Sequence, residues 1–434
     1  MTIFFSALSV WLIATTVLSA EPPNIILILA DDVGRDWVGC YGSPHHTPSI
    51  DRLSVEGVRY ETVWSASHGL HSQVMLLTGQ YPFRYGLTQN DKQPQFDDEG
   101  LRLESLVAFS RLVRDAGYAT VIGGAWQMSQ KGSQPQASLQ YLGFDEHCVW
   151  TEAIDSQPGA QERYWGGSIM TNGKREQVPY APDSINSFLI EFAQSERHKP
   201  FFMYYPMLLA HGPYSITPLN KSRRPESEHE LYAGNVTYMD HLVGRLIKAI
   251  DEAGLRENTL VIFTGGNGSA MAGALHGESA LKGKGSETDY GVHVPFIVRA
   301  PFLTHGERTS KDLIDFTDVF PSVLEVANVT PPQNLQLDGR SFIPSLKGSE
   351  DPFKKRSWIF SQLGSCRMVR DWEHILDSRG NFHDLTKDPR QEKQVSPLDK
   401  IAPGRRQRLE MILDRFSEDV EVPFPSSNKR NATP

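Results

Sequence analysis

The segment at residues 24–30 constrains the fold more than any other part of the chain. It reads Asn-Ile-Ile-Leu-Ile-Leu-Ala, a continuous apolar run with several β-branched residues, and Asp31 and Asp32 follow it directly. An uninterrupted apolar strand needs cover on both faces, and strands of that kind occur in parallel sheets. The sequence therefore predicts a central strand in a sheet that has helices on both sides.

Shorter apolar runs with the same texture recur along the chain, and helical patterns lie between them. The clearest helical pattern covers residues 232–253, and Gly254 is placed to cap its end. Strands and helices that alternate in this way favour a doubly wound α/β fold with a mostly parallel sheet. In such folds function gathers beyond the carboxyl ends of the strands. The other predicted strands are residues 119–122, 201–205, 260–264 and 296–298.

The texture of the sequence changes after about residue 345. Short, turn-separated strand candidates at residues 357–360, 367–369 and 374–376 predict a small antiparallel sheet. We therefore expect a main domain at residues 22–345 and a C-terminal α+β subdomain at residues 346–421. The remaining residues, 422–434, are rich in Pro, Ser and Asn and are predicted to be frayed.

The first twenty residues are typical of a secretory signal peptide. Residues 3–18 are apolar and almost uncharged, and Ser19 and Ala20 provide small residues before Glu21. We expect an exported protein, periplasmic or extracellular, that does not span a membrane once the signal is cleaved. A membrane anchor is the alternative, although the run is slightly short for a span of roughly 20 residues.

Charge and cysteine content narrow the range of partners and of covalent cross-links. The net charge is −9, and no run of basic residues indicates nucleic acid as a partner. The three cysteines, Cys40, Cys148 and Cys366, permit at most one disulfide and leave one thiol over. Their spacing fits no zinc motif.

Polar residues follow several predicted strands, where an α/β sheet collects its functional groups. Asp31 and Asp32 could supply the clustered oxygen ligands that hard cations prefer, or could cap a helix or turn. Asn267 could add an amide oxygen, or could only adopt a left-handed turn. His211 and Lys284 lie in loops, where either could meet an anion or could be structural. All five positions are expected on one rim of the sheet.

Longer motifs stand in unbroken order over roughly residues 22–395. They are the run at residues 23–32, Thr47-Pro48-Ser49, Leu76-Leu77-Thr78-Gly79, Ala210-His211-Gly212-Pro213, Gly291-Val292-His293-Val294-Pro295 and Asp384-Leu385-Thr386. With these motifs the chain resembles a sulfatase of the alkaline-phosphatase-like superfamily, of the arylsulfatase or heparan N-sulfatase kind. The resemblance implies a mostly parallel α/β sheet with a small C-terminal subdomain, and a hydrolase that acts on sulfate esters.

The resemblance also implies a catalytic residue that this chain lacks. The family carries a cysteine in the pattern Cys-x-Pro-Ser-Arg, which is oxidised to formylglycine, and the hydrated aldehyde, bound to calcium, attacks sulfur. Alignment on the Leu-x-Thr-Gly run places Gly69 at the cysteine position and Gln73 at the arginine position. Glycine has no side chain to oxidise, so we expect no formylglycine and no nucleophile at Gly69.

Three further substitutions fall at family positions. The sulfate-binding lysine and histidine align with Ala125 and Gln127, and one metal-binding carboxylate aligns with Gly266. We therefore expect a weakened calcium site, since calcium usually takes 6–8 oxygen ligands. The residues that remain are Asp31, Asp32 and Asn267 of the metal set, and His211 and Lys284 of the catalytic and sulfate-binding set.

Three hypotheses for the function follow. The leading one is a pseudo-sulfatase that keeps the fold and has lost the hydrolysis of sulfate esters. The second is a repurposed metal-dependent hydrolase, such as a phosphoesterase, with Ser67 or Ser72 as nucleophile. A transition metal such as zinc would be held there by Asp31, Asp32, His68 and His71. The third is a module that binds a sulfated glycan or small molecule through His211 and Lys284 without cleaving it.

Overall fold

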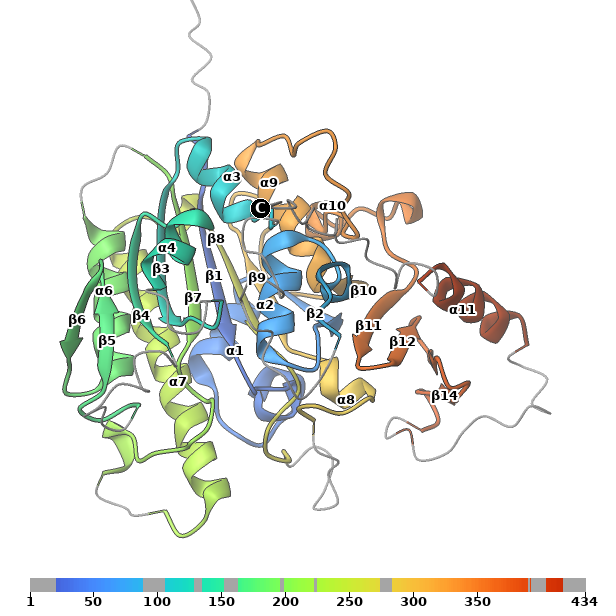
Figure 1. Cartoon of the computed structure of the whole chain (residues 1–434), viewed down its shortest axis with the longest axis horizontal. Coiled ribbons are helices and arrows are strands. Elements are labelled where there is room, and N and C mark those ends of the chain that lie inside the picture. The colour runs from blue at the N-terminus through green and yellow to red at the C-terminus, as the bar shows by residue number, and fades with distance from the viewer. Residues whose placement is uncertain are drawn as a thin grey trace, which may run out of the picture.

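The computed structural model describes residues 21–88, 106–128, 135–151, 163–195, 199–221, 225–273, 283–388, 391 and 403–416. The predicted signal peptide and the predicted frayed tail lie outside these residues. Within them, helices cover both faces of a large, mostly parallel sheet, and a small antiparallel sheet lies beside it (Figure 1). The predicted α/β fold class is confirmed.

The large sheet has ten strands among the described residues, in the order β10-β2-β9-β8-β1-β7-β3-β4-β5-β6. Its strands are β1 (Asn24–Ala30), β2 (Val58–Trp64), β3 (Ala119–Ala125), β4 (Glu146–Trp150), β5 (Ser168–Thr171), β6 (Lys174–Gln177), β7 (Phe201–Met207), β8 (Thr259–Gly265), β9 (Phe296–Arg299) and β10 (Arg308–Asp315). β1 lies near the centre and pairs in parallel with β7 and β8. The strand that was clearest in the sequence is therefore also central in the sheet.

Two apolar clusters explain why β1 has no polar face. The helices are α1 (Pro48–Val55), α2 (Gly69–Thr78), α3 (Phe109–Asp115), α4 (Pro135–Tyr141), α6 (Ala181–Gln194), α7 (Glu228–Glu252), α8 (Asp289–Val292), α9 (Val319–Ala327), α10 (Ile343–Leu346) and α11 (Pro403–Arg415). Ile25, Leu27 and Leu29 pack in one cluster with α2, α3 and α9. Ile26 and Ile28 pack in the other cluster with α6 and α7. Successive side chains of β1 thus enter opposite layers, as the apolar run predicts.

Two local predictions differ from the structure. Residues 296–298 form a strand as expected, but β9 pairs antiparallel with both β8 and β2, because a buried apolar run does not encode strand direction. Helix α7 begins at Glu228 instead of residue 232, since Ser227 caps it by accepting a hydrogen bond from the Glu230 amide. Gly254 follows the helix with a φ of 73°, as the predicted cap requires.

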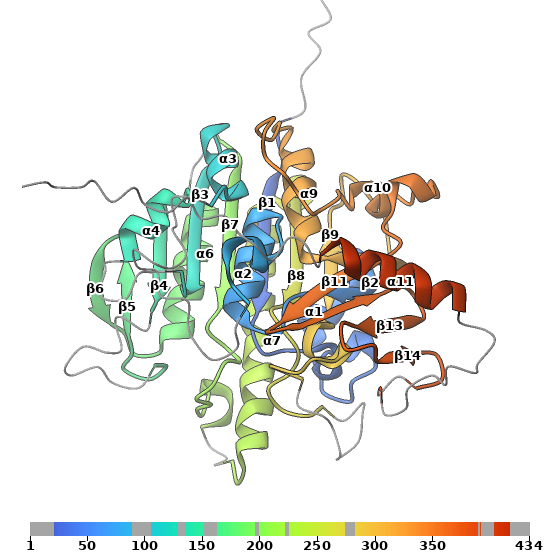
Figure 2. The same ribbon diagram turned by 45° about the vertical axis from the view of Figure 1, so that its right-hand side comes forward.

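The small antiparallel sheet contains β11 (Ile359–Leu363), β12 (Cys366–Arg370), β13 (His374–Asp377) and β14 (Phe382–Asp384). Three of these strands were predicted, and β14 was not. Helix α11 packs against β12 and β13 (Figure 2). The domain boundary near residue 345 stays a prediction, although the two sheets lie on opposite sides of it in the sequence.

All three cysteines are free thiols, and Cys148 and Cys366 are buried. The sequence predicted at least one unpaired thiol, and in the structure all three thiols are unpaired. Among the residues that the structure describes, no helix has the length and apolar character needed to cross a bilayer.

Candidate functional site

The carboxyl ends of three neighbouring strands bring the predicted site residues together. β1 pairs in parallel with β7 on one side and with β8 on the other, so the segments after these strands share one edge of the sheet. Asp31 and Asp32 follow β1, His211 follows β7 and Asn267 follows β8. Lys284 reaches the same place from the segment before α8. The expectation of a shared rim therefore matches the observed geometry, whereas the roles of these residues stay predictions.

Asp32 is the centre of the polar contacts at this rim. Its Oδ2 accepts a hydrogen bond from Lys284 Nζ at 2.8 Å, and its Oδ1 accepts one from Asn267 Nδ2 at 3.0 Å. Its backbone φ of 64° is a left-handed conformation that is uncommon for a residue with a side chain. Both carboxylate oxygens of Asp32 are thus engaged by nitrogen donors of this chain.

His211 lies beside the same carboxylate, with its Nε2 3.8 Å from Asp32 Oδ2. Its Nδ1 is 2.8 Å from the acceptor Gly212 O and 3.1 Å from the donor Arg163 Nη1. Its Nε2 lies 3.2 Å from Lys284 Nζ. Burial lowers the pKa of His211, Asp32 partly opposes that shift, and Lys284 adds to it.

Gly69 is the first residue of α2, directly opposite Asp31. A Cβ atom added to Gly69 would lie 2.7 Å from Asp31 Oδ2, closer than real Cβ contacts come. The side-chain amide of Gln73 lies in the same region and lowers the pKa of Asp31 slightly, but neither amide atom has a hydrogen-bond partner. The Asp31 carboxylate therefore lies against the backbone at position 69.

Gly266 also lacks a side chain, and the Asp31 carboxylate lies close to its backbone as well. A Cβ atom on Gly266 would lie 1.7 Å from Asp31 Oδ1, so any larger residue there requires Asp31 to move. Burial raises the pKa of Asp31 to about 7, and the neighbouring Asp32 charge contributes in the same direction. Asp31 thus lies in a desolvated position between two glycines.

These residues do not fit a complete calcium shell. Gly69 and Gly266 offer no side-chain oxygen, and both oxygens of Asp32 already accept N–H donors. Among the described residues of this site, Asp31 Oδ1, Asn267 Oδ1 and Gln73 Oε1 are buried acceptors without a partner, far fewer than the 6–8 oxygens that calcium prefers. Within the described ranges, no group of three or more His, Cys, Asp or Glu residues is arranged to hold a metal ion.

The end of β3 carries Ala125, with Gln127 two residues further on, and an arginine lies nearby. Ala125 is buried and pairs in register with Trp150 of β4, and the half-buried Gln127 follows. The guanidinium carbon of Arg163 lies 3.9 Å from the centroid of the Trp150 ring. Sequence analysis did not identify Arg163, because a lone arginine outside a motif has no spacing signature. Its aromatic neighbours Tyr164 and Trp165 were the only signal.

The hydroxyl groups near Gly69 are held by backbone groups. Ser72 Oγ donates to Ala66 O at 3.0 Å and accepts from Ala66 N at 3.1 Å. Ser67 Oγ donates to Ser286 O at 3.1 Å, and both serines are buried. Burial lowers the pKa of His71 to about 4, so this imidazole is neutral. These contacts favour a structural role for the loop.

Comparison with solved structures places the fold. The crystal structure of Ps i-CgsB in complex with k-i-k-neocarrahexaose is 22% identical, with a TM-score of 0.78, and 93% of this chain and 94% of that chain are covered. The structure of BT4656 in complex with its substrate D-glucosamine-2-N,6-O-disulfate is 19% identical, with a TM-score of 0.73 and coverage of 94% and 100%. These similarities support the same overall fold along nearly the whole chain.

Comparison of sequences identifies the family. The family model described as Sulfatase matches residues 23–329. Arylsulfatase D of Homo sapiens is 27% identical over 445 residues, which cover 83% of this chain and 74% of that protein. The matched region includes every residue of the rim described above. The chain therefore belongs to the sulfatase family.

Proposed function

We propose that this protein is a sulfatase-family member that no longer hydrolyses sulfate esters by the formylglycine route and that binds a sulfated ligand. The observation that carries the proposal is the contact between Gly69 and Asp31. Position 69 has no side chain to become a nucleophile, and a Cβ atom there would meet Asp31 Oδ2 at 2.7 Å. Any side chain at position 69 would therefore require the Asp31 carboxylate to shift.

Magnitudes support the loss of hydrolysis. Removal of the nucleophile from a covalent mechanism costs on the order of 10⁶-fold in rate, as measured for a serine protease. Each charged hydrogen bond lost to the sulfate group costs about 1.5–3 kcal/mol more. Ala125 and Gln127 replace two such groups of the family, and Gln73 replaces its arginine. Water at Gly69 cannot compensate for all of these losses together.

The retained residues support binding of an anion. Lys284 and His211 lie 3.2 Å apart and face the same edge of the sheet as Asp32. A lysine ammonium in a half-buried position is a strong point charge for an oxyanion. Two structural relatives are complexes with carbohydrate ligands, one of them a disulfated glucosamine, which supports a sulfated sugar as the ligand class. We place the protein outside the cytoplasm, on the strength of the predicted signal peptide.

Calcium has a weak site at most in this proposal. Asp31, Asp32 and Asn267 are the remaining ligands, and Lys284 already neutralises Asp32 through a 2.8 Å ion pair. A cation at this place would have to displace the lysine ammonium or compete with it. The proposal therefore assigns no catalytic step to a metal.

The repurposed hydrolase has less support. Its candidate nucleophiles, Ser67 and Ser72, each donate the hydroxyl proton to a backbone carbonyl instead of to a basic side chain. Absence of zinc in the purified protein, together with unchanged behaviour of Ser67→Ala, would remove this alternative.

Binding and turnover measured side by side test the proposed function. The purified protein is titrated with a sulfated polysaccharide and with the same polysaccharide after chemical desulfation, and 4-nitrophenyl sulfate hydrolysis is followed in parallel. We expect salt-sensitive binding of the sulfated form only, and hydrolysis at the rate of the buffer blank. Turnover of the aryl sulfate at the rates of active sulfatases would overturn the proposal.

A further inference from the structure

Arg163 lies near the positions at which the sequence analysis predicted missing family cations. Its guanidinium stacks 3.9 Å from the ring centroid of Trp150, the last residue of β4. Trp150 is the register partner of Ala125, and its carbonyl accepts a hydrogen bond from the amide of Trp126 at 2.8 Å. The arginine therefore lies beside the end of β3, where the family lysine and histidine align with Ala125 and Gln127.

Arg163 and Lys284 lie at opposite ring nitrogens of His211. Arg163 Nη1 donates to Gly212 O at 2.6 Å and lies 3.1 Å from His211 Nδ1. Lys284 Nζ lies 3.2 Å from His211 Nε2. Two cationic side chains therefore border one imidazole ring. An arrangement of this kind attracts an anion that can meet both of them.

One edge of the Arg163 guanidinium has no partner. Its Nε is buried without a hydrogen bond, and Nη2 makes none to any described residue. These two nitrogens form one edge of the planar fork, with two nearly parallel N–H donors. Leaving such a donor buried and unpaired is costly, whereas an oxyanion can accept from both N–H groups at once.

We propose that Arg163 and Lys284 together bind the sulfate group of the ligand, with Arg163 replacing the charge that the chain lost at Ala125. The inference rests on the proposed function and names the groups that recognise the anion. Stacking on Trp150 fixes the plane of the guanidinium, so little side-chain freedom is lost when the sulfate binds. Lys284 contributes a point charge from the other side of His211. The ligand class is a sulfate monoester or sulfated sugar.

Calorimetric titration of the full chain with 4-nitrophenyl sulfate tests this inference, with 4-nitrophenol as the control ligand without sulfate. Arg163→Gln is expected to raise Kd about 10-fold or more. Arg163→Lys keeps the charge but loses the fork, and is expected to raise Kd by a smaller factor. Arg175→Gln is the matched control and should leave Kd unchanged, because among the described residues the Arg175 side chain hydrogen-bonds to Ser168 on the outer strand pair.

The outcomes separate this inference from the proposed function. If the wild-type chain does not bind the ester, both fail. If the wild-type chain binds and Lys284→Gln weakens binding while Arg163→Gln does not, only the role of Arg163 fails. Thermal unfolding of each variant shows whether it is folded. Should Arg163→Gln not fold, Arg163→Lys decides, and an unchanged Kd in that variant contradicts the bidentate contact.

Discussion

At the scale of single residues, two glycines determine what the site can do. Asp31 is a ligand position in the family, yet here its carboxylate lies against Gly69 and Gly266. Its Oδ1 has no hydrogen-bond partner, and burial holds its pKa well above the ordinary value for an aspartate. A carboxylate this close to both glycines must shift if either of them gains a side chain.

Gly69→Cys should therefore fail to restore sulfatase activity. The new Cβ meets Asp31 Oδ2 at 2.7 Å, and the substitutions at Gln73, Ala125 and Gln127 remain. We expect hydrolysis of 4-nitrophenyl sulfate at the blank rate in a host that matures sulfatases, and a loss of about 1–3 kcal/mol in unfolding free energy from overpacking. Gly404→Cys is the control, since a Cβ there meets nothing within 4 Å. Measurable turnover by Gly69→Cys would show that position 69 alone silences the enzyme.

The sequence predicted the identity of the retained residues but not their contacts. Asp31, Asp32, Asn267, His211 and Lys284 could be placed on one rim, because parallel strands deliver their following residues to one edge. The inward position of Asp31 depends on atoms that glycine lacks, which a residue pattern does not report. The position of Arg163 depends on its stacking against Trp150, a contact between distant segments.

At the scale of elements, apolar runs predicted buried strands well and strand partners poorly. β1 and β8 are uninterrupted apolar runs and were predicted. β2 and β10 carry charged residues such as Arg59, Glu61 and Lys311 between buried positions and were not identified. They form a parallel pair across more than 200 residues of chain, and their burial depends on each other. Local pattern contains no information about such distant pairing.

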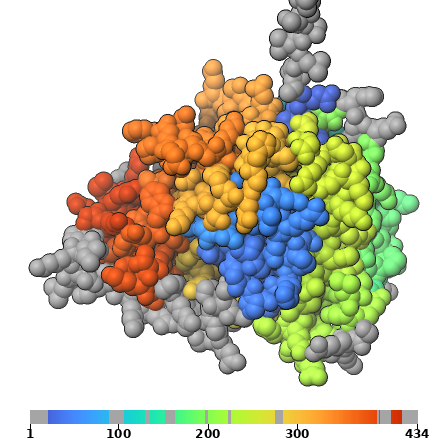
Figure 3. Space-filling model, turned by 180° about the vertical axis from the view of Figure 1, so that it is seen from behind, coloured from blue at the N-terminus to red at the C-terminus, as the bar shows by residue number. Residues whose placement is uncertain are grey.

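Helix α1 depends on a carboxylate from another helix. The residue that precedes α1 does not cap the helix with its own side chain. Instead, Asp240 of α7 accepts hydrogen bonds from Ser49 N at 3.1 Å and from Ile50 N at 2.9 Å. α1 (blue) and α7 (yellow-green) lie side by side on the rear face of the molecule (Figure 3). Two free amide donors of the helix N-terminus are satisfied in this way.

Asp240→Ala should consequently destabilise the protein by about 0.5–2 kcal/mol, the usual cost of losing a cap. Urea unfolding followed by circular dichroism measures this difference. Glu252→Ala, which removes an exposed ion pair with Lys248 on the same helix, should change stability by less than about 0.5 kcal/mol. Equal effects of the two substitutions would contradict the capping role of Asp240.

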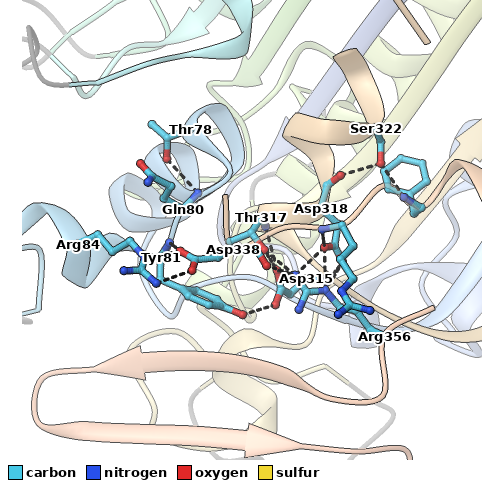
Figure 4. Close-up of polar contacts among 12 residues, drawn as sticks. Thr78, Gln80, Tyr81, Arg84, Asp315, Thr317, Asp318, Ser322, Asp338 and Arg356 are labelled. Carbon is cyan, nitrogen blue, oxygen red and sulfur yellow. Dashed lines mark hydrogen bonds and ion pairs between the residues drawn. The ribbon is translucent and has the colours of Figure 1, made fainter. Parts of the chain in front are cut away.

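At the scale of the whole molecule, a buried polar network joins the two sheets (Figure 4). Arg356, just before β11, donates to Asp318 at 2.7 Å and to Asp338 O at 2.8 Å, and pairs with Asp315 at 3.4 Å. Tyr81, after α2, donates to Asp315 Oδ2 at 2.7 Å. One guanidinium therefore links the end of β10, the loop after α2 and the C-terminal sheet.

Arg356→Met should be strongly destabilising, by about 3–5 kcal/mol, because it leaves buried carboxylates without their counter-ion. The measurement is the unfolding free energy in urea. Arg405→Met removes an exposed pair with Glu373 and should cost at most about 1 kcal/mol. A small effect of Arg356→Met would mean that the network contributes little to holding the two sheets together.

The same network should make stability depend on pH. Burial raises the pKa of Asp315 to about 7, Arg356 opposes this, and Asp318 adds to it. Between about pH 4 and 7 the folded state then holds a proton that the unfolded state releases, so this contribution to stability is lost as pH rises through 7. Asp315→Asn should flatten the fall in unfolding free energy between pH 5 and 8. Identical pH profiles for the wild type and Asp315→Asn would contradict the raised pKa.

The central claim is that the protein binds a sulfate ester and leaves it intact. The most direct measurement incubates the protein with a stoichiometric amount of a sulfated oligosaccharide, recovers the complex, and quantifies both bound oligosaccharide and free inorganic sulfate. We expect the oligosaccharide to be recovered fully sulfated from the wild type and not to be retained by Lys284→Gln. Release of inorganic sulfate by the wild type, absent from Lys284→Gln, would contradict it.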